Sequence, residues 1–245
     1  MTDVIERDVV YTRGETTMRG LLLAPSAPAT PGATVVLIHD AFGLGGFSLA
    51  EARRYAELGW VVFAADVWGD RLTVAGPDEI GPLIGGMVSR RDEWIARIAA
   101  AHDAARAQPE VDRDRLVTVG YCFGGSSALE YLRTGGAVRG AVAIHPGLDL
   151  LASDTEWTPA PGAEVLVCAG SIDPMATPDQ RAALTGAMDA AGVPWEFDLY
   201  GGATHAFTNP HLTESPRPDL FAYHPRAAAR SQQATDRFLR EVLAG

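Results

Sequence analysis

A glycine-rich turn around Cys122 has the residue types and spacing of a nucleophile turn. An apolar, strand-like run ends at Gly120, one residue intervenes, and Cys122 is followed by Phe123, two glycines and a helix-like stretch. This is the Gly-x-nucleophile-x-Gly pattern with cysteine in place of serine, and its glycines leave room for strained backbone angles. The helix N-terminus favours a thiolate, and the N–H of Phe123 points toward a developing oxyanion. The alternative is a buried structural cysteine, but strand, turn and helix together favour a nucleophile.

A nucleophilic cysteine needs a base, and the base needs an orienting carboxylate. The strand-like run Glu164–Ala169 leads into a loop that carries Asp173, and a later strand-like run leads through two glycines to His205. The order nucleophile, acid, histidine is that of α/β-hydrolases. The sequence therefore predicts Asp173 as orienter and His205 as base, with an Asp turn or a helix cap as the alternative role of Asp173.

Four other histidines fit the base less well. His211 and His224 also follow Asp173 and remain alternatives, but both lie in a proline-rich stretch without the strand-loop setting. His102 is expected on a solvated helix face. His145 ends a strand-like run, where it either lines the pocket or packs in the interior.

The loop after the predicted strand Thr34–Ile38 is expected to supply a second oxyanion donor. The backbone N–H of Ala41 is the best placed, as the partner of the N–H of Phe123. Asp40 puts a carboxylate beside the nucleophile, and ordinary turn chemistry is its alternative role.

The elements that hold these residues alternate between strand-like and helix-like runs, which predicts an α/β fold. A mostly parallel central sheet with helices on both faces, preceded by an antiparallel hairpin, is expected as one domain over residues 1–245. Strands are predicted at Asp8–Thr12, Met18–Ala24, Thr34–Ile38, Trp60–Ala65, Leu116–Gly120, Val138–Ile144, Glu164–Ala169 and Trp195–Leu199. Helices are predicted at Ser48–Leu58, Pro82–Ala107, Phe123–Arg133, Pro178–Ala191 and Arg226–Leu243. The stretch Gly69–Arg91 is expected to be an irregular loop that leads into a helix, and His211–Pro225 is expected to be a long loop. Both are expected to border the site.

Composition excludes several classes of function. The chain has 245 residues and a formal charge of −11, which argues against nucleic-acid binding. No apolar run approaches the roughly 20 residues that span a bilayer. Two cysteines are too few for a disulfide framework, so a reducing cytoplasm is the expected location. Cys168 lies inside an apolar run without glycines and is predicted to belong to the core.

Taken together, these motifs resemble the dienelactone hydrolase family (carboxymethylenebutenolidases). Gly120–Gly125 is similar to the family's Gly-Tyr-Cys-x-Gly-Gly turn, and Asp173 and His205 are similar to its acid and its histidine. The loop His39–Gly43 resembles its oxyanion loop. The resemblance implies the α/β-hydrolase fold, a Cys-His-Asp triad and no cofactor or metal. It also implies that Asp40 stands where the family has a glutamate that controls protonation of the thiol.

Resemblance to the family does not by itself imply that the chain acts on dienelactone. Members that act on dienelactone hold its carboxylate with arginines, one of them four residues after the histidine, where this chain has Asn209. Another arginine comes from the region before the nucleophile turn, where Arg71, Arg90 and Arg91 are possible counterparts. The residues predicted to contact substrate are Arg90, Arg91, Phe42 and Tyr121.

The predicted function is cysteine-dependent hydrolysis of a small-molecule ester or lactone through a thioester acyl-enzyme. One alternative is a broad carboxylesterase or thioesterase without dienelactone activity, and another is a thiol sensor that turns nothing over. The expected partner is a small-molecule substrate, and neither nucleic acid nor membrane is expected to bind. The chain is expected to be a monomer or a small homo-oligomer.

Overall fold

The computed structural model describes residues 4–26, 31–152 and 156–244. The chain divides into two compact units, Met1–Thr118 and Val119–Gly245. Strand β5 (Val111–Tyr121) belongs mostly to the first unit and ends in the second. The expectation of a single domain stays a prediction.

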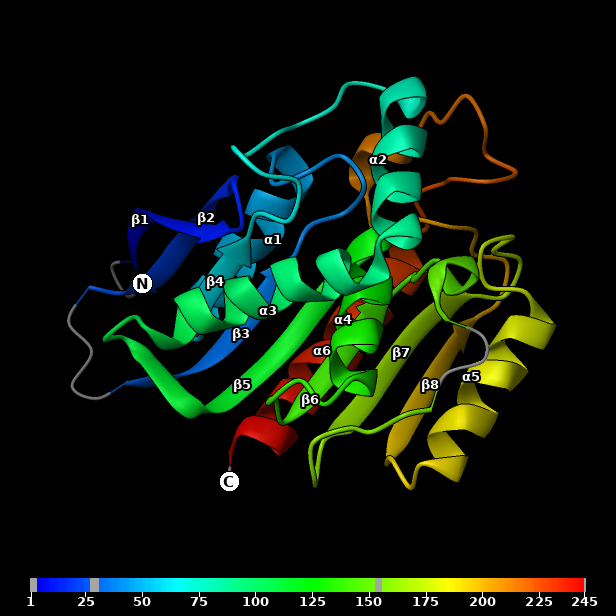
Figure 1. Cartoon of the computed structure of the whole chain (residues 1–245). Helices are drawn as coiled ribbons and strands as arrows, with labels where there is room; N and C mark the ends of the chain where they lie inside the picture. The colour runs from blue at the N-terminus through cyan, green and yellow to red at the C-terminus, as the bar shows by residue number, and fades with distance from the viewer. Residues whose placement is uncertain (1–3, 27–30, 153–155, 245) are drawn as a thin grey trace. The chain divides into compact units, whose positions relative to one another are not determined.

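The first unit begins with the predicted antiparallel hairpin. Strands β1 (Val4–Arg13) and β2 (Thr16–Pro25) pair in antiparallel register around Gly14, whose φ of 54° suits a tight turn. Strand β2 continues antiparallel to β4 (Val61–Ala65), and β4 pairs in parallel with β3 (Gly32–Ile38). The strand order in this unit is therefore β1-β2-β4-β3. Helices α1 (Gly46–Glu57) and α3 (Arg91–Arg106) pack against these strands from opposite faces (Figure 1).

The segment before the nucleophile turn differs from its prediction. Instead of a loop and one helix over Pro82–Ala107, it forms two helices, α2 (Pro77–Ser89) and α3. Helix α2 begins at Pro77, followed by Asp78 and Glu79 in its first turn, which is a favourable helix start. The prediction was wrong because it placed the helix start at the second proline of this segment. The helices separate at Arg90, where φ is −122° and ψ is 57°.

In the second unit, strands β6 (Gly140–Ile144), β7 (Glu164–Gly170) and β8 (Trp195–Tyr200) pair in parallel, in that order. Helix α4 (Phe123–Arg133) packs on β6, and α6 (Pro225–Leu243) covers β6 and β7 from the other face (Figure 1). Helix α5 (Pro178–Ala190) contacts the short 3-10 helix η1 (Leu148–Leu150), and a second short helix, η2 (Pro210–Leu212), precedes α6. The loop predicted over 211–225 is otherwise present.

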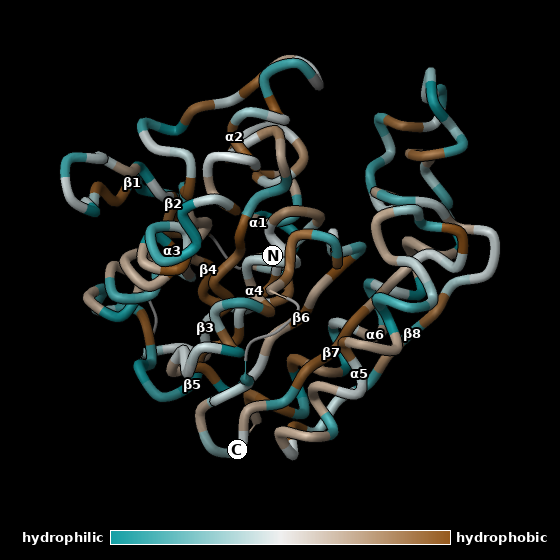
Figure 2. The backbone as a smooth tube through the Cα atoms, turned by 45° about the vertical axis from the view of Figure 1, so that its right-hand side comes forward, coloured by the Kyte–Doolittle hydropathy of each residue, from teal (hydrophilic) through white to brown (hydrophobic). Residues whose placement is uncertain are grey.

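The predicted fold class is confirmed: parallel pairs dominate, the N-terminal strands are antiparallel, and helices cover both faces. Every residue of β4 and β6 is buried, as expected for strands covered on both sides. Figure 2 shows apolar residues concentrated along the strands. Among the described residues, no helix has the length and apolar character needed to cross a membrane.

Candidate active site

The turn from β5 into α4 gives Cys122 an unusual backbone conformation. Its φ is 54° and its ψ is −116°, a region that non-glycine residues rarely adopt. The peptide N–H of Cys122 donates to the carbonyl of Ile144 at 3.0 Å, and its own carbonyl accepts from Gly125 at 2.9 Å. Both bonds tie the strained residue to its surroundings. Cys122 is part-exposed and lies at the N-terminus of α4, where the sequence predicts it.

The flanking glycines make this turn possible. A Cβ atom at Gly120 would overlap the carbonyl of Gly124, and one at Gly125 would lie 3.2 Å from the carbonyl of Gly120. The strand end and the first helical turn are therefore in backbone contact. Only glycine at position 120 allows Cys122 to occupy the tip of so sharp a turn.

Asp173 and His205 meet at the carboxyl ends of their strands. Nδ1 of His205 lies 2.9 Å from Oδ2 of Asp173, and both side chains are fully buried. The other carboxylate oxygen of Asp173 accepts from the N–H of Met175 at 2.8 Å. The predicted orienter and the predicted base therefore form a fixed pair, with Nδ1 of the imidazole directed at the carboxylate.

Cys122 affects the protonation of the same imidazole. Burial by itself would lower the pKa of His205, but the charge of Cys122, the hydrogen bond with Asp173 and the charge of Asp173 raise it to about 10. The Nε2 atom of His205 nevertheless has no hydrogen bond of ordinary length and angle to any described residue. Cys122 is thus near enough to affect His205 without an aligned hydrogen bond, and such geometry is common before substrate binds. The raised pKa therefore favours the protonated, imidazolium form of His205.

The remaining histidines have other partners. His211 is exposed in η2, and its N–H donates to the side chain of Asn209. His224 caps α6, where its Nδ1 accepts from the N–H of Ala227. His102 was expected in solvent, which is wrong: it is buried and lies 2.8 Å from the hydroxyl of Thr118. The face of α3 that carries His102 lies against β5. The alanines around His102 did not indicate in the sequence which face of the helix is buried.

His145, for which the sequence allows either pocket lining or packing, lies against His205. The two ring centroids are 5.3 Å apart at an interplanar angle of 66°. Tyr121, predicted to contact substrate, is 1% exposed and packs on His145 with a centroid distance of 5.9 Å. The sequence offered no signal for these contacts beyond the position of His145 at a strand end.

The predicted oxyanion loop lies in the first unit. Asp40 is largely buried, and its Oδ1 accepts from the N–H of Phe42 at 2.9 Å, which is the turn chemistry considered as an alternative. Ala41 is buried, whereas the side chain of Phe42 is 44% exposed. The roles of Ala41, Asp40 and Phe42 toward the thiol and the substrate stay predictions.

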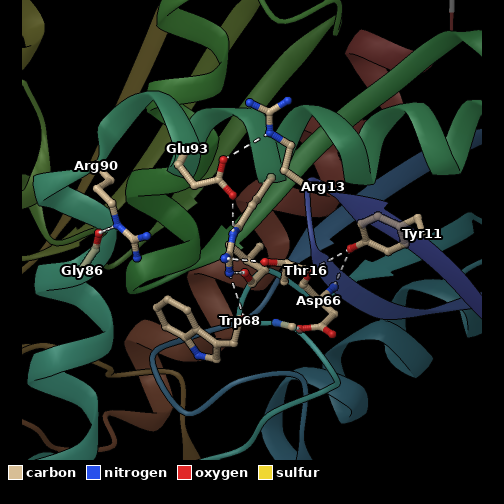
Figure 3. A network of polar contacts seen from close by, with 11 residues as sticks. Tyr11, Arg13, Thr16, Asp66, Trp68, Gly86, Arg90 and Glu93 are labelled. Atoms are coloured by element: carbon tan, nitrogen blue, oxygen red, sulfur yellow. Dashed lines mark hydrogen bonds and ion pairs between the residues drawn. The ribbon is translucent and has the colours of Figure 1, made fainter.

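The arginines proposed from the sequence have protein partners. Nε of Arg90 donates to the carbonyl of Gly86 at 3.3 Å (Figure 3). The guanidinium of Arg91 lies 5.4 Å from the ring centroid of Trp94, a cation–π distance. Arg71 donates to Asp8 at 2.7 Å and to two backbone carbonyls. Substrate binding by Arg90 or Arg91 stays a prediction.

A network in the first unit holds the segment after β4, and the sequence did not predict it (Figure 3). The carboxylate of Asp66 accepts from the N–H groups of Gly69 and Arg71, and the hydroxyl of Tyr11 donates to the Asp66 carbonyl at 2.7 Å. Arg97 is nearly buried and donates to the carbonyls of Val67 and Trp68. An acid directly after a strand was the available signal.

Within the described ranges, no group of three or more His, Cys, Asp or Glu side chains could hold a metal ion.

The family to which the chain belongs follows from comparison with known proteins. A model of the dienelactone hydrolase family matches residues 18–243. This chain belongs to the dienelactone hydrolase family. It is therefore a hydrolase of the dienelactone hydrolase type, and its sheet is that of the α/β-hydrolase fold.

Individual relatives agree with this membership. A dienelactone hydrolase-like promiscuous phosphotriesterase from metagenomic libraries is 33% identical, with a TM-score of 0.88 and coverage of 98% of both chains. A structure named m3DLH is also 33% identical, with a TM-score of 0.87 and coverage of 98% of this chain and 99% of its own. A Methylorubrum extorquens protein with a provisional carboxymethylenebutenolidase name is 27% identical over 195 residues. That match covers 75% of this chain and 66% of the relative, slightly under two thirds of its length.

Proposed function

We propose that this protein hydrolyses small esters or lactones with Cys122 as its nucleophile, through a thioester acyl-enzyme. The observation that carries the proposal is the paired geometry around His205. One ring nitrogen lies 2.9 Å from a buried aspartate, and the strained thiol at the tip of the nucleophile turn acts on the same ring. A base fixed by a carboxylate next to an activated nucleophile is the arrangement that acyl transfer needs.

The first half of the reaction forms the thioester. The Cys122 thiolate attacks the ester carbonyl, and the electron pair of the C=O bond moves onto oxygen. The N–H of Phe123, at the start of α4, stabilises that oxyanion. When the tetrahedral intermediate collapses, the C–O bond to the leaving group breaks, and the His205 imidazolium gives its proton to the departing alkoxide or enolate.

The second half restores the thiolate. Neutral His205, held by Asp173, takes a proton from water as the water attacks the thioester carbonyl. Collapse of the second intermediate breaks the C–S bond and releases the carboxylic acid. The thiolate and the imidazolium are then paired again. The N–H of Ala41 as second oxyanion donor and Asp40 as a gate for the thiol stay predictions from the sequence.

Two alternatives remain distinct from a dienelactone hydrolase. A broad carboxylesterase or thioesterase is favoured by Asn209, an uncharged residue that caps η2, because no charge is then present at that position to hold a substrate carboxylate. A thiol sensor would need Cys122 to react without turnover. The buried base-acid pair argues against a sensor, because only hydrolysis requires it.

Steady-state turnover of three substrates tests the proposed function. We expect the wild-type protein to hydrolyse p-nitrophenyl acetate. Two further substrates are assayed for comparison: cis-dienelactone as an anionic lactone, and paraoxon as a neutral phosphotriester. Paraoxon is included because a 33% identical relative is named a phosphotriesterase. Preference for the lactone would assign carboxylate recognition, and turnover of p-nitrophenyl acetate alone would assign a broad esterase. Failure to turn over any of the three would contradict ester hydrolysis and favour the sensor.

The protonation of His205 gives a second prediction, because its pKa is raised to about 10. Titration of the His205 ring by NMR should retain the imidazolium at pH 8 and lose it only as the pH approaches 10. The chain contains no lysine, so no side-chain ammonium group titrates in that range. Asp173→Asn removes a negative charge that raises the pKa, so its midpoint should move down. A wild-type midpoint close to the ordinary value near 6.5 would contradict the ion pair.

A further inference from the structure

His145 has a backbone conformation that needs an explanation. Its φ is 39°, in the left-handed region that favours glycine, and it follows directly after β6. Its N–H donates to the carbonyl of Cys168 on β7 at 2.7 Å, and only 1% of the residue is exposed. Strain of this kind persists where the surrounding structure fixes it, and it gathers at functional sites.

The side chain of His145 is directed at the base by two contacts. One is the edge-to-face ring contact with His205, at a centroid distance of 5.3 Å. The other joins Nε2 of His145 to the hydroxyl of Thr208 at 2.8 Å, in the loop that also carries His205. Phe207 also packs on the His145 ring, at a centroid distance of 5.3 Å and near a right angle.

The charge of His145 is settled by the same neighbours. Burial, and then the positive charge of His205, hold the pKa of His145 well below its ordinary value. In the part of the chain that the structure describes, His205, Tyr121, Phe207 and Thr208 contact the ring, and none of these four carries a carboxylate. His145 is therefore neutral next to an imidazolium, and its Nδ1 has no hydrogen-bond partner among the described residues.

Further contacts fix His205 itself. Its ring meets the Phe221 ring at a centroid distance of 5.8 Å and an angle of 80°. Its backbone N–H donates to the carbonyl of Leu220 at 3.0 Å. Asp173 at Nδ1, with His145 and Phe221 against the ring, therefore restrains the orientation of the imidazole.

We propose that His145 is a positioning residue for the reaction: tethered by Thr208, its ring holds His205 in the rotamer that pairs with Cys122. Without the tether, His205 could turn away from the thiol while keeping its bond to Asp173. The thiolate would then lose its cation. This inference rests on the proposed function, because it assigns His145 to the base of that mechanism.

The test measures the pH dependence of Cys122 alkylation by iodoacetamide, together with kcat and KM for p-nitrophenyl acetate. His145→Asn is the removal variant, because asparagine tolerates positive φ. Thr208→Val removes the tether without a change of shape, and Thr208→Ser keeps the hydroxyl. His211→Asn is the matched control, because it makes the same replacement at an exposed histidine. Cys168 is buried and does not compete for the reagent.

We expect His145→Asn and Thr208→Val to move the alkylation midpoint upward by about one pH unit, the size of shift that the loss of a nearby opposite charge produces. Both should lower kcat about tenfold with little change in KM. Thr208→Ser and His211→Asn should follow the wild type. If His145→Asn fails to fold, Thr208→Val carries the test alone.

Wild-type alkylation midpoints in folded Thr208→Val, with a loss of melting temperature only, would overturn the inference and assign His145 to packing. A different result would remove the proposed function instead. If wild-type Cys122 alkylates no faster at neutral pH than a free thiol, the ion pair itself is absent. The two failures are therefore distinguishable.

Discussion

Cys122→Ala is expected to lower turnover of the best ester substrate by about a thousandfold or more, with the fold unchanged. The variant removes the only atom that forms a covalent bond with the acyl group in the proposed mechanism. Oxyanion stabilisation and substrate binding remain and can support only slow attack by water. Alanine has the same backbone restrictions as cysteine at φ 54°, so the strain of the turn does not increase. Steady-state kinetics and thermal unfolding measure the two effects separately.

The matched control is Cys168→Ala, the other cysteine of the chain. Cys168 is fully buried in β7, so its replacement should cost some stability and leave kcat close to the wild type. Turnover near the wild-type level in Cys122→Ala would remove the nucleophile from the mechanism. Equal loss in both variants would point to a general effect on folding.

Gly120→Ala is expected to destabilise the folded protein by at least about 3 kcal/mol, because the added methyl group overlaps backbone rather than a movable side chain. The Cβ would meet the Gly124 carbonyl and lie 2.6 Å from the N atom of Gly125. Relief requires β5 and α4 to separate, which moves Cys122 as well. Denaturant unfolding should therefore report a lower free energy, and any folded fraction should have lost turnover.

Gly186→Ala provides the comparison for that measurement. Gly186 lies within α5, and a Cβ there would have no atom within 4 Å. Alanine in an open helical position is expected to stabilise by roughly 0.5–1 kcal/mol. If Gly120→Ala behaved like Gly186→Ala, the backbone contact at the turn would not be required.

Most of the fold could be predicted because the buried strands are nearly continuous apolar runs. The predicted strand Trp60–Ala65 differs from β4 by one residue, and the predicted helix Phe123–Arg133 has the bounds of α4. The error over 77–106 has a local cause. Two prolines, Pro77 and Pro82, both suit a helix start, and only the backbone at Arg90 separates α2 from α3.

The candidate site could be predicted as a list of residues but not as a set of contacts. Chain order and glycine turns single out Cys122, Asp173 and His205, and the second and third are in contact. The contact between His145 and Thr208 joins residues 63 positions apart. Such pairing depends on how β6 and the loop after β8 end beside one another, and no periodicity in the sequence encodes it.

The difference in burial between the two thiols also provides a way to measure how often the folded protein opens. Burial raises the pKa of Cys168 to about 12, whereas Cys122 is part-exposed. An aromatic disulfide reagent should therefore count one thiol per chain in the native protein and two after denaturation. The slow appearance of the second would time the excursions that expose β7, much as amide exchange does. Cys168 would thus record, without any label, how often the centre of the second unit opens.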